Sequence, residues 1–169
     1  TLYYCHKVPE KGIWRIPAQG GDAVQVTASY GPPLCAMTVT AQGLYYTAAP
    51  DSSNKYSIQF VSFSTGQSRP VVLSERPFVS LALSVSPDGR FVAVAAGADR
   101  QAAIWIHELD GSRPPRRLTF DGENRFPIWS PDGRRIALVA RGIALAQWWR
   151  RGSSHIDQSE LWIMNADGS

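Results

Sequence analysis

The sequence predicts an all-β fold built from repeated sheets of four antiparallel strands, the blades of a β-propeller. Short apolar runs alternate with turns rich in glycine and aspartate, and no segment shows the 3.6-residue period of a helix. Similar segments recur along the chain, with turn glycines at Gly43, Gly89 and Gly133 that are 46 and 44 residues apart. Four short strands in each period of about 45 residues are typical of a propeller blade.

One repeat near the middle of the chain shows how each strand is defined. Residues 81–85 form the first apolar run. Ser86-Pro-Asp-Gly89 then turns the chain, because proline and aspartate suit the middle of a turn and glycine accepts a positive φ. Residues 91–95 predict the second strand and residues 104–109 the third. Residues 116–120 predict a short fourth strand, which completes the blade.

A second series of similar segments keeps the same period. Its motifs close on glycines that are 45, 45 and 57 residues apart, so the last unit carries an insertion. These closing glycines are Gly21, Gly66, Gly111 and Gly168. Two interleaved series with one period are hard to obtain by chance. The sequence therefore predicts one partial propeller over residues 1–169, with blade units at about 2–27, 34–73, 80–120 and 125–169.

The repeated motifs resemble a known family. Ser86-Pro-Asp-Gly-Arg90, Trp129-Ser-Pro-Asp-Gly-Arg134 and Leu161-Trp-Ile-Met-Asn-Ala-Asp-Gly168 look like the repeats of TolB-like, WD-repeat-like bacterial propellers. The blade built on Gly43 lacks the Pro-Asp pair of this pattern. The opening stretch around Gly12-Ile-Trp-Arg-Ile-Pro17 is most similar to propellers that follow a winged-helix DNA-binding domain in bacterial transcriptional regulators. No winged helix accompanies it in this sequence.

The resemblance also implies the size of the ring. TolB-like propellers have six blades, so the predicted strands make up about half of one. A half ring leaves two blade faces uncovered, and we therefore expect the chain to be a fragment of a longer protein. The alternative is a circularly permuted four-bladed ring, which is the small end of the range known for propellers.

The charge of the chain gives little support to binding of nucleic acid. Seventeen basic residues stand against fourteen acidic ones, for a net charge of +3, and the arginines do not form one run. A solvated arginine-rich surface is the favoured interpretation, and direct DNA binding by this stretch is not expected. The longest apolar run, residues 91–96, is too short to span a bilayer.

The two cysteines carry no recognisable motif. Neither Cys5 nor Cys35 has a C-x-x-C partner, so zinc and thioredoxin chemistry are unsupported. Both stand in apolar, strand-like contexts, where a free cysteine behaves as a small hydrophobic residue. The cysteines alone do not indicate the redox compartment.

Catalytic motifs are also missing from the sequence. There is no G-x-S-x-G elbow and no glycine-rich nucleotide loop, and the histidines His6, His107 and His155 share no metal-ligand spacing. Three aspartates could suggest calcium or acid–base chemistry, but their Pro-Asp-Gly and Ala-Asp-Gly contexts mark them as turn formers. They are Asp88, Asp132 and Asp167. We expect a protein that is not an enzyme and has no cofactor or metal.

One loop face is the predicted site of ligand or partner contacts. In a propeller, the loop between the second and third strands opens on the same side as the connections between blades. Tryptophan and arginine, which are enriched in binding hot spots, occur in the insertion of the last unit. The alternative is that its tryptophans fold back onto the blade. The predicted contact residues are Arg76, Phe78, Asn124, Arg125, Phe126, Trp148, Trp149, Arg150 and Arg151.

Three functions are consistent with this sequence. The favoured one is a non-catalytic module that binds a protein or small ligand as the sensory part of a bacterial regulator. The first alternative is the gating propeller of a prolyl-oligopeptidase-like serine peptidase whose catalytic domain lies elsewhere, and the second is a periplasmic TolB-type envelope scaffold. A periplasmic or membrane-attached location is favoured over a cytoplasmic one, and the ligand or partner is not identified. Fold resemblance carries most of this choice.

Overall fold

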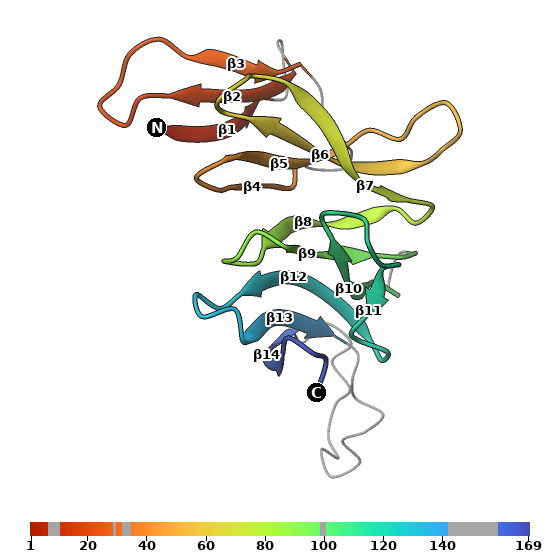
Figure 1. Ribbon diagram of the computed structural model, residues 1–169. Helices are drawn as coiled ribbons and strands as arrows, with labels where there is room; N and C mark the ends of the chain where they lie inside the picture. The colour runs from red at the N-terminus through yellow and green to blue at the C-terminus, as the bar shows by residue number, and fades with distance from the viewer. Residues whose placement is uncertain (7–10, 29, 32–34, 99–100, 142–158) are drawn as a thin grey trace.

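The computed structural model describes residues 1–6, 11–28, 30–31, 35–98, 101–141 and 159–169. These residues form fourteen β-strands and no helix, which confirms the predicted all-β fold. The strands belong to four sheets, which we call blades 1 to 4 in chain order (Figure 1).

Each blade is a run of strands that follow one another in the chain. Blade 1 contains β1 (Leu2–His6), β2 (Gly12–Ile16) and β3 (Val24–Thr27). Blade 2 contains β4 (Met37–Val39), β5 (Gly43–Ala48), β6 (Tyr56–Ser62) and β7 (Ser68–Ser74). Blade 3 contains β8 (Phe78–Val85), β9 (Phe91–Ala96), β10 (Ala103–Glu108) and β11 (Arg116–Arg117). Blade 4 contains β12 (Glu123–Trp129), β13 (Arg135–Arg141) and β14 (Ser159–Asn165).

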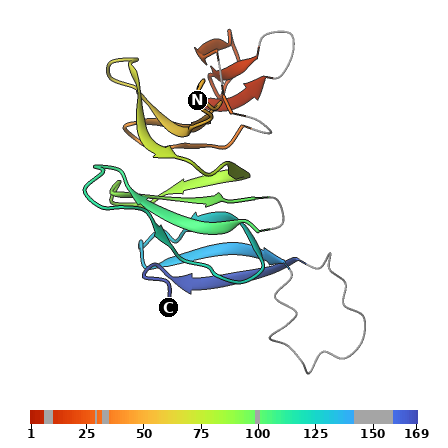
Figure 2. The ribbon, with the colours of Figure 1, turned by 90° about the vertical axis from the view of Figure 1, so that its right-hand side faces the viewer.

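The connectivity gives every blade two distinct ends. Each strand pairs antiparallel with the next one in its blade, so successive turns alternate between the ends. The turn face carries the turn between the first and second strands and the turn after the third. The connection face carries the turn between the second and third strands and the link to the next blade. Figure 2 shows the four sheets side by side in chain order.

Strand β9 shows why neighbouring blades pack together. Val92 and Val94 are fully buried in the cluster shared with blade 2, whereas Ala93 and Ala95 are fully buried in the cluster shared with blade 4. Side chains alternate between the two faces of a strand, so a strand that is covered on both faces must be apolar throughout. The small alanines allow Ile136 of β13 to approach closely.

The same rule applies at each blade boundary. Ile13 of blade 1 packs with Leu44 of blade 2, and Ile58 of blade 2 packs with Val92 of blade 3. Ile104 of blade 3 packs in turn within the cluster that holds the blade 4 side chains. The hydrophobic core is therefore divided into three layers, each lying between two sheets.

The Ser-Pro-Asp-Gly motifs form the turns that the sequence predicts. Ser86 Oγ accepts a hydrogen bond from the Phe91 N–H (2.9 Å) and donates to Asp88 Oδ1 (2.5 Å). The corresponding Ser130 and Asp132 make the same pair of bonds in blade 4, with Ser130 donating at 2.6 Å. Gly89 and Gly133 have φ values of 71° and 70°. The conformation at these glycines is confirmed.

Gly43 stands in the same turn of blade 2 but has a different role. It is the first residue of β5, and it is not among the positive-φ residues. A Cβ atom at this position would collide with the carbonyl oxygen of Val61 and with the ring of Phe60 on β6. Glycine is therefore needed here for the close approach of β5 and β6.

The fourth strand of blade 3 is shorter than the predicted range of residues 116–120. Strand β11 spans Arg116–Arg117 only, although the Leu118 N–H still donates to Ile104 O at 2.8 Å. The Ile104 N–H then donates to the Thr119 hydroxyl at 2.9 Å. The Thr119 hydroxyl thus takes the place of a backbone carbonyl as acceptor, and the regular ladder of backbone hydrogen bonds ends at this point.

A disulfide connects blade 1 to the segment that leads into blade 2. Cys5 of β1 is bonded to Cys35, with Cα atoms 6.2 Å apart and a sequence separation of 30 positions. Both cysteines border the cluster of Ile13 and Leu44. The interpretation of the two cysteines as free hydrophobic residues is wrong. Their pairing follows from the packing of two blades, which the local sequence around each cysteine does not encode.

Replacing Gly43 by alanine should destabilise the protein more than the same change at Gly89. We expect a loss of about 3 kcal/mol for Gly43→Ala, at the upper end of overpacking costs. Gly89 has open space around its Cβ position, so Gly89→Ala should cost only about 1 kcal/mol for its positive φ. Chemical denaturation measures both free energies of unfolding. A cost for Gly43→Ala no larger than that of Gly89→Ala would contradict the packing argument.

Removing the disulfide should destabilise the protein by about 3 to 4 kcal/mol, the entropic effect of a closed loop of this length. The comparison is between the native chain and the Cys5→Ser, Cys35→Ser double variant in thermal unfolding. Dithiothreitol should lower the melting temperature of the native chain to that of the variant and leave the variant unchanged. Two titratable thiols in the denatured, unreduced native chain would show that the bond is absent.

Candidate functional site

A groove crosses the connection face between blades 2 and 3. It consists of two hollows of about 480 Å³ and 210 Å³, which share Glu75, Arg76, Ala96 and Trp105 in their walls. The larger hollow is completed by Pro77, Gly97, Ala98, Gln101, Ala103, Arg117, Phe120 and Gly122. The smaller one is completed by Leu73, Ser74, His107 and Pro115. Both belong to the face on which the sequence predicts ligand contacts.

Arg76 and Trp105 form the ridge between the two hollows. The guanidinium carbon of Arg76 lies 4.5 Å from the centre of the Trp105 ring, within the range of a cation–π interaction. Ser74 fixes the backbone of Arg76, because its hydroxyl accepts from the Arg76 N–H at 3.0 Å and donates to the Arg76 carbonyl at 2.9 Å. Trp105 is held from below by the cluster between blades 2 and 3. The exposed guanidinium of Arg76 is therefore held against the ring of Trp105, which is itself fixed by packing.

A second arginine–aromatic pair lines the larger hollow. The guanidinium carbon of Arg117 lies 5.2 Å from the centre of the exposed Phe120 ring, and its Nε donates to Thr119 O at 2.7 Å. Two guanidinium groups thus stand against the single carboxylate of Glu75. Cationic and aromatic surfaces side by side suit a ligand that carries both an anionic group and an apolar group.

His107 lines the smaller hollow from below. It is 8% exposed, on the same face of β10 as Trp105 and directly opposite Val92 of β9. Burial lowers the pKa of His107 from 6.5 to about 4, because the charged imidazolium loses its hydration there. The neutral imidazole is therefore the form present at physiological pH.

The structure distributes the predicted contact residues between the surface and the interior. Arg76 is exposed and lines both hollows. Phe78 is only 6% exposed and packs in the cluster between blades 2 and 3. Asn124 is 3% exposed, and its side-chain amide donates to Asp121 O at 2.7 Å. Phe78 and Asn124 lie within strands β8 and β12, so their side chains point into the blades instead of the rim.

Arg125 links blade 4 to blade 3. Arg125 donates from Nη1 to Val79 O at 2.9 Å and forms an ion pair with Glu123. Phe126 has a φ of 56° at the bulge of β12 and is half-buried. The remaining predicted contacts, Trp148, Trp149, Arg150 and Arg151, lie outside the described residues.

Arg76 is the one predicted contact residue in the described groove lining, and the prediction misses the other arginine and the two aromatic residues that line it. Trp105 lies inside a repeat strand, a position that predicts packing between blades, and it is in fact partly buried against the cluster between blades 2 and 3. Arg117 and Phe120 read as parts of a fourth strand, but that strand ends at Arg117. A pattern of arginines near aromatic residues in the connections between blades was the available signal.

The described residues supply no evidence for a resident metal. No group of three or more histidine, cysteine, aspartate or glutamate side chains lies close enough to hold an ion in this part of the chain. The search for long apolar helices that could cross a membrane also finds none among the described residues.

Sequence comparison relates part of the chain to TolB. No family model matches this chain. The Tol-Pal system protein TolB of Alcanivorax borkumensis is 32% identical over 97 residues, which are 57% of this chain and 22% of that protein. The chain thus aligns with about a fifth of the length of this curated relative.

Comparison with solved structures supports the same fold. TolB-type proteins of Agrobacterium tumefaciens and Acinetobacter baumannii superpose with TM-scores of 0.72 and 0.67. The Agrobacterium protein is 18% identical, and the superposition covers 98% of this chain and 57% of that protein. The Acinetobacter protein is 20% identical, and the superposition covers 95% of this chain and 37% of that protein. The TolB-like propeller fold is confirmed, and the chain corresponds to part of such a propeller. None of these relatives supports the expected likeness to propellers that follow a winged helix.

The burial of His107 predicts a loss of stability in acid. Between pH 6.5 and about 4, an unfolded chain binds a proton at this residue and the folded chain does not. The free energy of unfolding should therefore fall as the pH drops through this window, by up to about 3 kcal/mol from His107 alone. His107→Gln removes this contribution, so the difference between the two proteins isolates it in urea unfolding at several pH values. Parallel pH profiles for the two proteins would contradict the assignment.

Proposed function

We propose that the chain is part of the propeller of a TolB-type scaffold of the bacterial envelope, which binds a protein partner and does no catalysis. The observation that carries the proposal is the 32% identity to the Tol-Pal system protein TolB over 97 residues. This choice replaces the sensory module of a regulator, which no comparison favours.

The disulfide supports a location outside the cytoplasm. Cys5 and Cys35 are bonded to each other, and structural disulfides persist in oxidising compartments such as the bacterial periplasm. In a reducing cytoplasm this pair would be open, and blade 1 would lose its disulfide link to the segment that leads into blade 2. A periplasmic scaffold is therefore consistent with the way the chain is held together.

The groove on the connection face supports a protein partner. Arg76 stacked on Trp105 combines the two residue types most enriched at the centre of protein interfaces. The surrounding surface mixes polar and apolar groups, with Arg76 and Arg117 against the one carboxylate of Glu75, which favours a partner segment that places a carboxylate beside an apolar side chain.

One uncovered sheet supports further blades in the intact protein. On the side of blade 4 that faces away from blade 3, Ile128, Leu161 and Ile163 are 58%, 75% and 62% exposed. Ile128 and Ile163 flank Ala137 in register, so they form a continuous apolar row across the sheet. The opposite side of this sheet is covered by blade 3, and a further blade would cover the apolar row in the same way.

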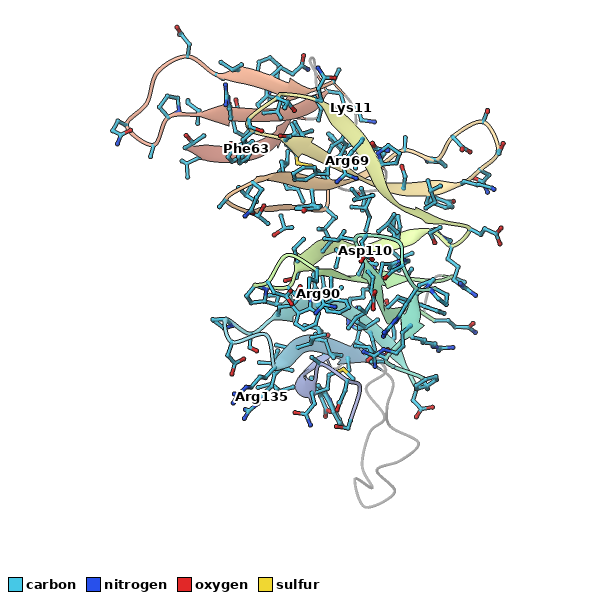
Figure 3. All side chains as sticks on the ribbon, in the orientation of Figure 1. Lys11, Phe63, Arg69, Arg90, Asp110 and Arg135 are labelled. Carbon is cyan, nitrogen blue, oxygen red and sulfur yellow. A yellow bond between two sulfur atoms is a disulfide. The ribbon has the colours of Figure 1, made fainter. Side chains whose placement is uncertain are left out.

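Binding to the Pal component of the same bacterium's Tol-Pal system tests the proposal. Isothermal titration calorimetry on the parent protein that carries this chain should show saturable binding. Arg76→Ala should weaken it about tenfold, the loss typical of a hot-spot arginine. Arg69→Ala is the matched control, because Arg69 also stacks on an aromatic ring, that of Phe60, but lies outside the groove (Figure 3).

Binding by the native protein tests the proposed function, and binding by Arg76→Ala tests where the partner binds. Absence of binding by the native protein would overturn the TolB-type function. Binding that Arg76→Ala leaves intact would retain the function and remove the groove around Arg76 as its site.

A further inference from the structure

The smaller hollow between blades 2 and 3 has the size of a pocket for one side chain. Its volume is about 210 Å³, which lies below the range of roughly 300–1,000 Å³ usual for small-ligand sites. Strand β7 of blade 2 supplies Leu73 and Ser74 to its walls, and strand β10 of blade 3 supplies Trp105 and His107 (Figure 1). The packing of two sheets therefore builds the hollow.

Four apolar side chains line this hollow: Leu73, Ala96, Trp105 and Pro115. Leu73 is 69% exposed although it lies within a strand, and Trp105 is only partly buried by the cluster beneath it. Apolar surface of both residues thus remains in contact with water. A ring that enters the hollow would bury part of that surface, which is favourable.

His107 is the polar group whose hydrogen-bonding capacity is open. It is 8% exposed, its ring nitrogens make no hydrogen bond within the described part of the chain, and burial alone lowers its pKa. The neutral imidazole has one donor and one acceptor nitrogen. The hydroxyl of Ser74, by contrast, already both accepts from and donates to the backbone of Arg76. A ligand group that reaches the base of the hollow would satisfy a buried polar side chain.

A neutral hydroxyl matches this environment better than a charged group. A hydroxyl both donates and accepts, so it can pair with either nitrogen of His107. A carboxylate would lose its hydration beside a neutral imidazole, and the charged groups of the lining, Glu75 and Arg76, are exposed and opposite in sign. Tyrosine carries a hydroxyl on an aromatic ring, and it is enriched in binding hot spots.

We propose that the smaller hollow binds a tyrosine side chain of the partner segment, with its ring against Trp105 and Leu73 and its hydroxyl hydrogen-bonded to His107. The inference rests on the proposed function for the presence of a partner segment, and it adds the side chain by which that segment is recognised. Arg76 borders the same hollow, so it lies where the carboxylate of that segment is expected.

Three short peptides test the hollow in the parent protein that carries this chain. The probe is acetyl-Ala-Tyr-Ala-amide, and its control carries phenylalanine, which lacks only the hydroxyl. A third peptide carries glutamate and tests a carboxylate as the occupant. The readout is the indole ¹H–¹⁵N resonance of Trp105, assigned by its loss in Trp105→Phe. We expect saturable binding of the tyrosine peptide, with the other two weaker by about fivefold, the effect of one ordinary hydrogen bond.

One substitution with a matched control locates the hydrogen bond. His107→Phe should weaken the tyrosine peptide about fivefold and leave the affinity of the phenylalanine peptide nearly unchanged, because only the hydroxyl loses its partner. His6→Phe is the control: Nδ1 of His6 is also buried without a hydrogen-bond partner among the described residues, but His6 belongs to blade 1 and does not line the hollow. This control should leave both affinities unchanged.

Several outcomes would overturn the inference. They are equal affinities of the tyrosine and phenylalanine peptides for the native protein, tighter binding of the glutamate peptide, or an equal loss for the tyrosine and phenylalanine peptides in His107→Phe. If that variant melts at a lower temperature, the comparison of peptides on the native protein decides. The Pal component is absent from these titrations, so tyrosine selectivity without binding of Pal would remove the proposed function alone. Binding of Pal without tyrosine selectivity would remove this inference alone.

Discussion

Burial of each sheet between two neighbours is the constraint on which the rest of this structure depends. Val92 and Ala93 are adjacent in sequence and point in opposite directions, yet neither is exposed to solvent. A strand in that position has no face exposed to water, so charged and polar side chains are restricted to the turns at its ends. This is why the charged and hydrogen-bonding groups of blade 3 gather at its two ends, in the turn of Asp88 and in the connection that carries Arg76.

The features that the sequence predicts correctly are those that a few consecutive residues determine. Ser86 and Asp88 close their turn on each other, and Gly89 provides the positive φ, so the motif specifies the turn wherever it occurs. The apolar runs and their period then specify the blades. The disulfide and the burial of Asn124 cannot be predicted from neighbouring residues in the same way, because each depends on which sheet packs against that part of the chain. The groove is predicted only in part for the same reason: its position follows from connectivity, but its walls come from two blades.

The two ends of the blades differ in their residues because their turns perform different tasks. A turn within a blade must reverse the chain in four residues, and aspartate does so by accepting hydrogen bonds from the backbone. A link between blades must instead cross from an outer strand to the next inner one, and here Arg76 lies across the ring of Trp105. Turn-forming aspartates therefore recur on the turn face, whereas the pair of Arg76 and Trp105 lies on the connection face. The separation arises from folding requirements, and binding can use it afterwards.

Arginine is suited to this architecture in a way that lysine is not. Arg116 of blade 3 reaches two successive carbonyl groups in the last turn of blade 4, and Arg125 of blade 4 reaches Val79 O of blade 3. A planar guanidinium can donate along two directions at once and still stack on a ring, whereas an ammonium group is a strongly hydrated point charge. The fourteen arginines and three lysines of the chain thus include side chains that join blades, beyond the solvated surface that composition suggests. Because Arg116 and Arg125 both cross the boundary between blades 3 and 4, the contacts that hold these two blades in register also set the shape and charge of the surface where they meet.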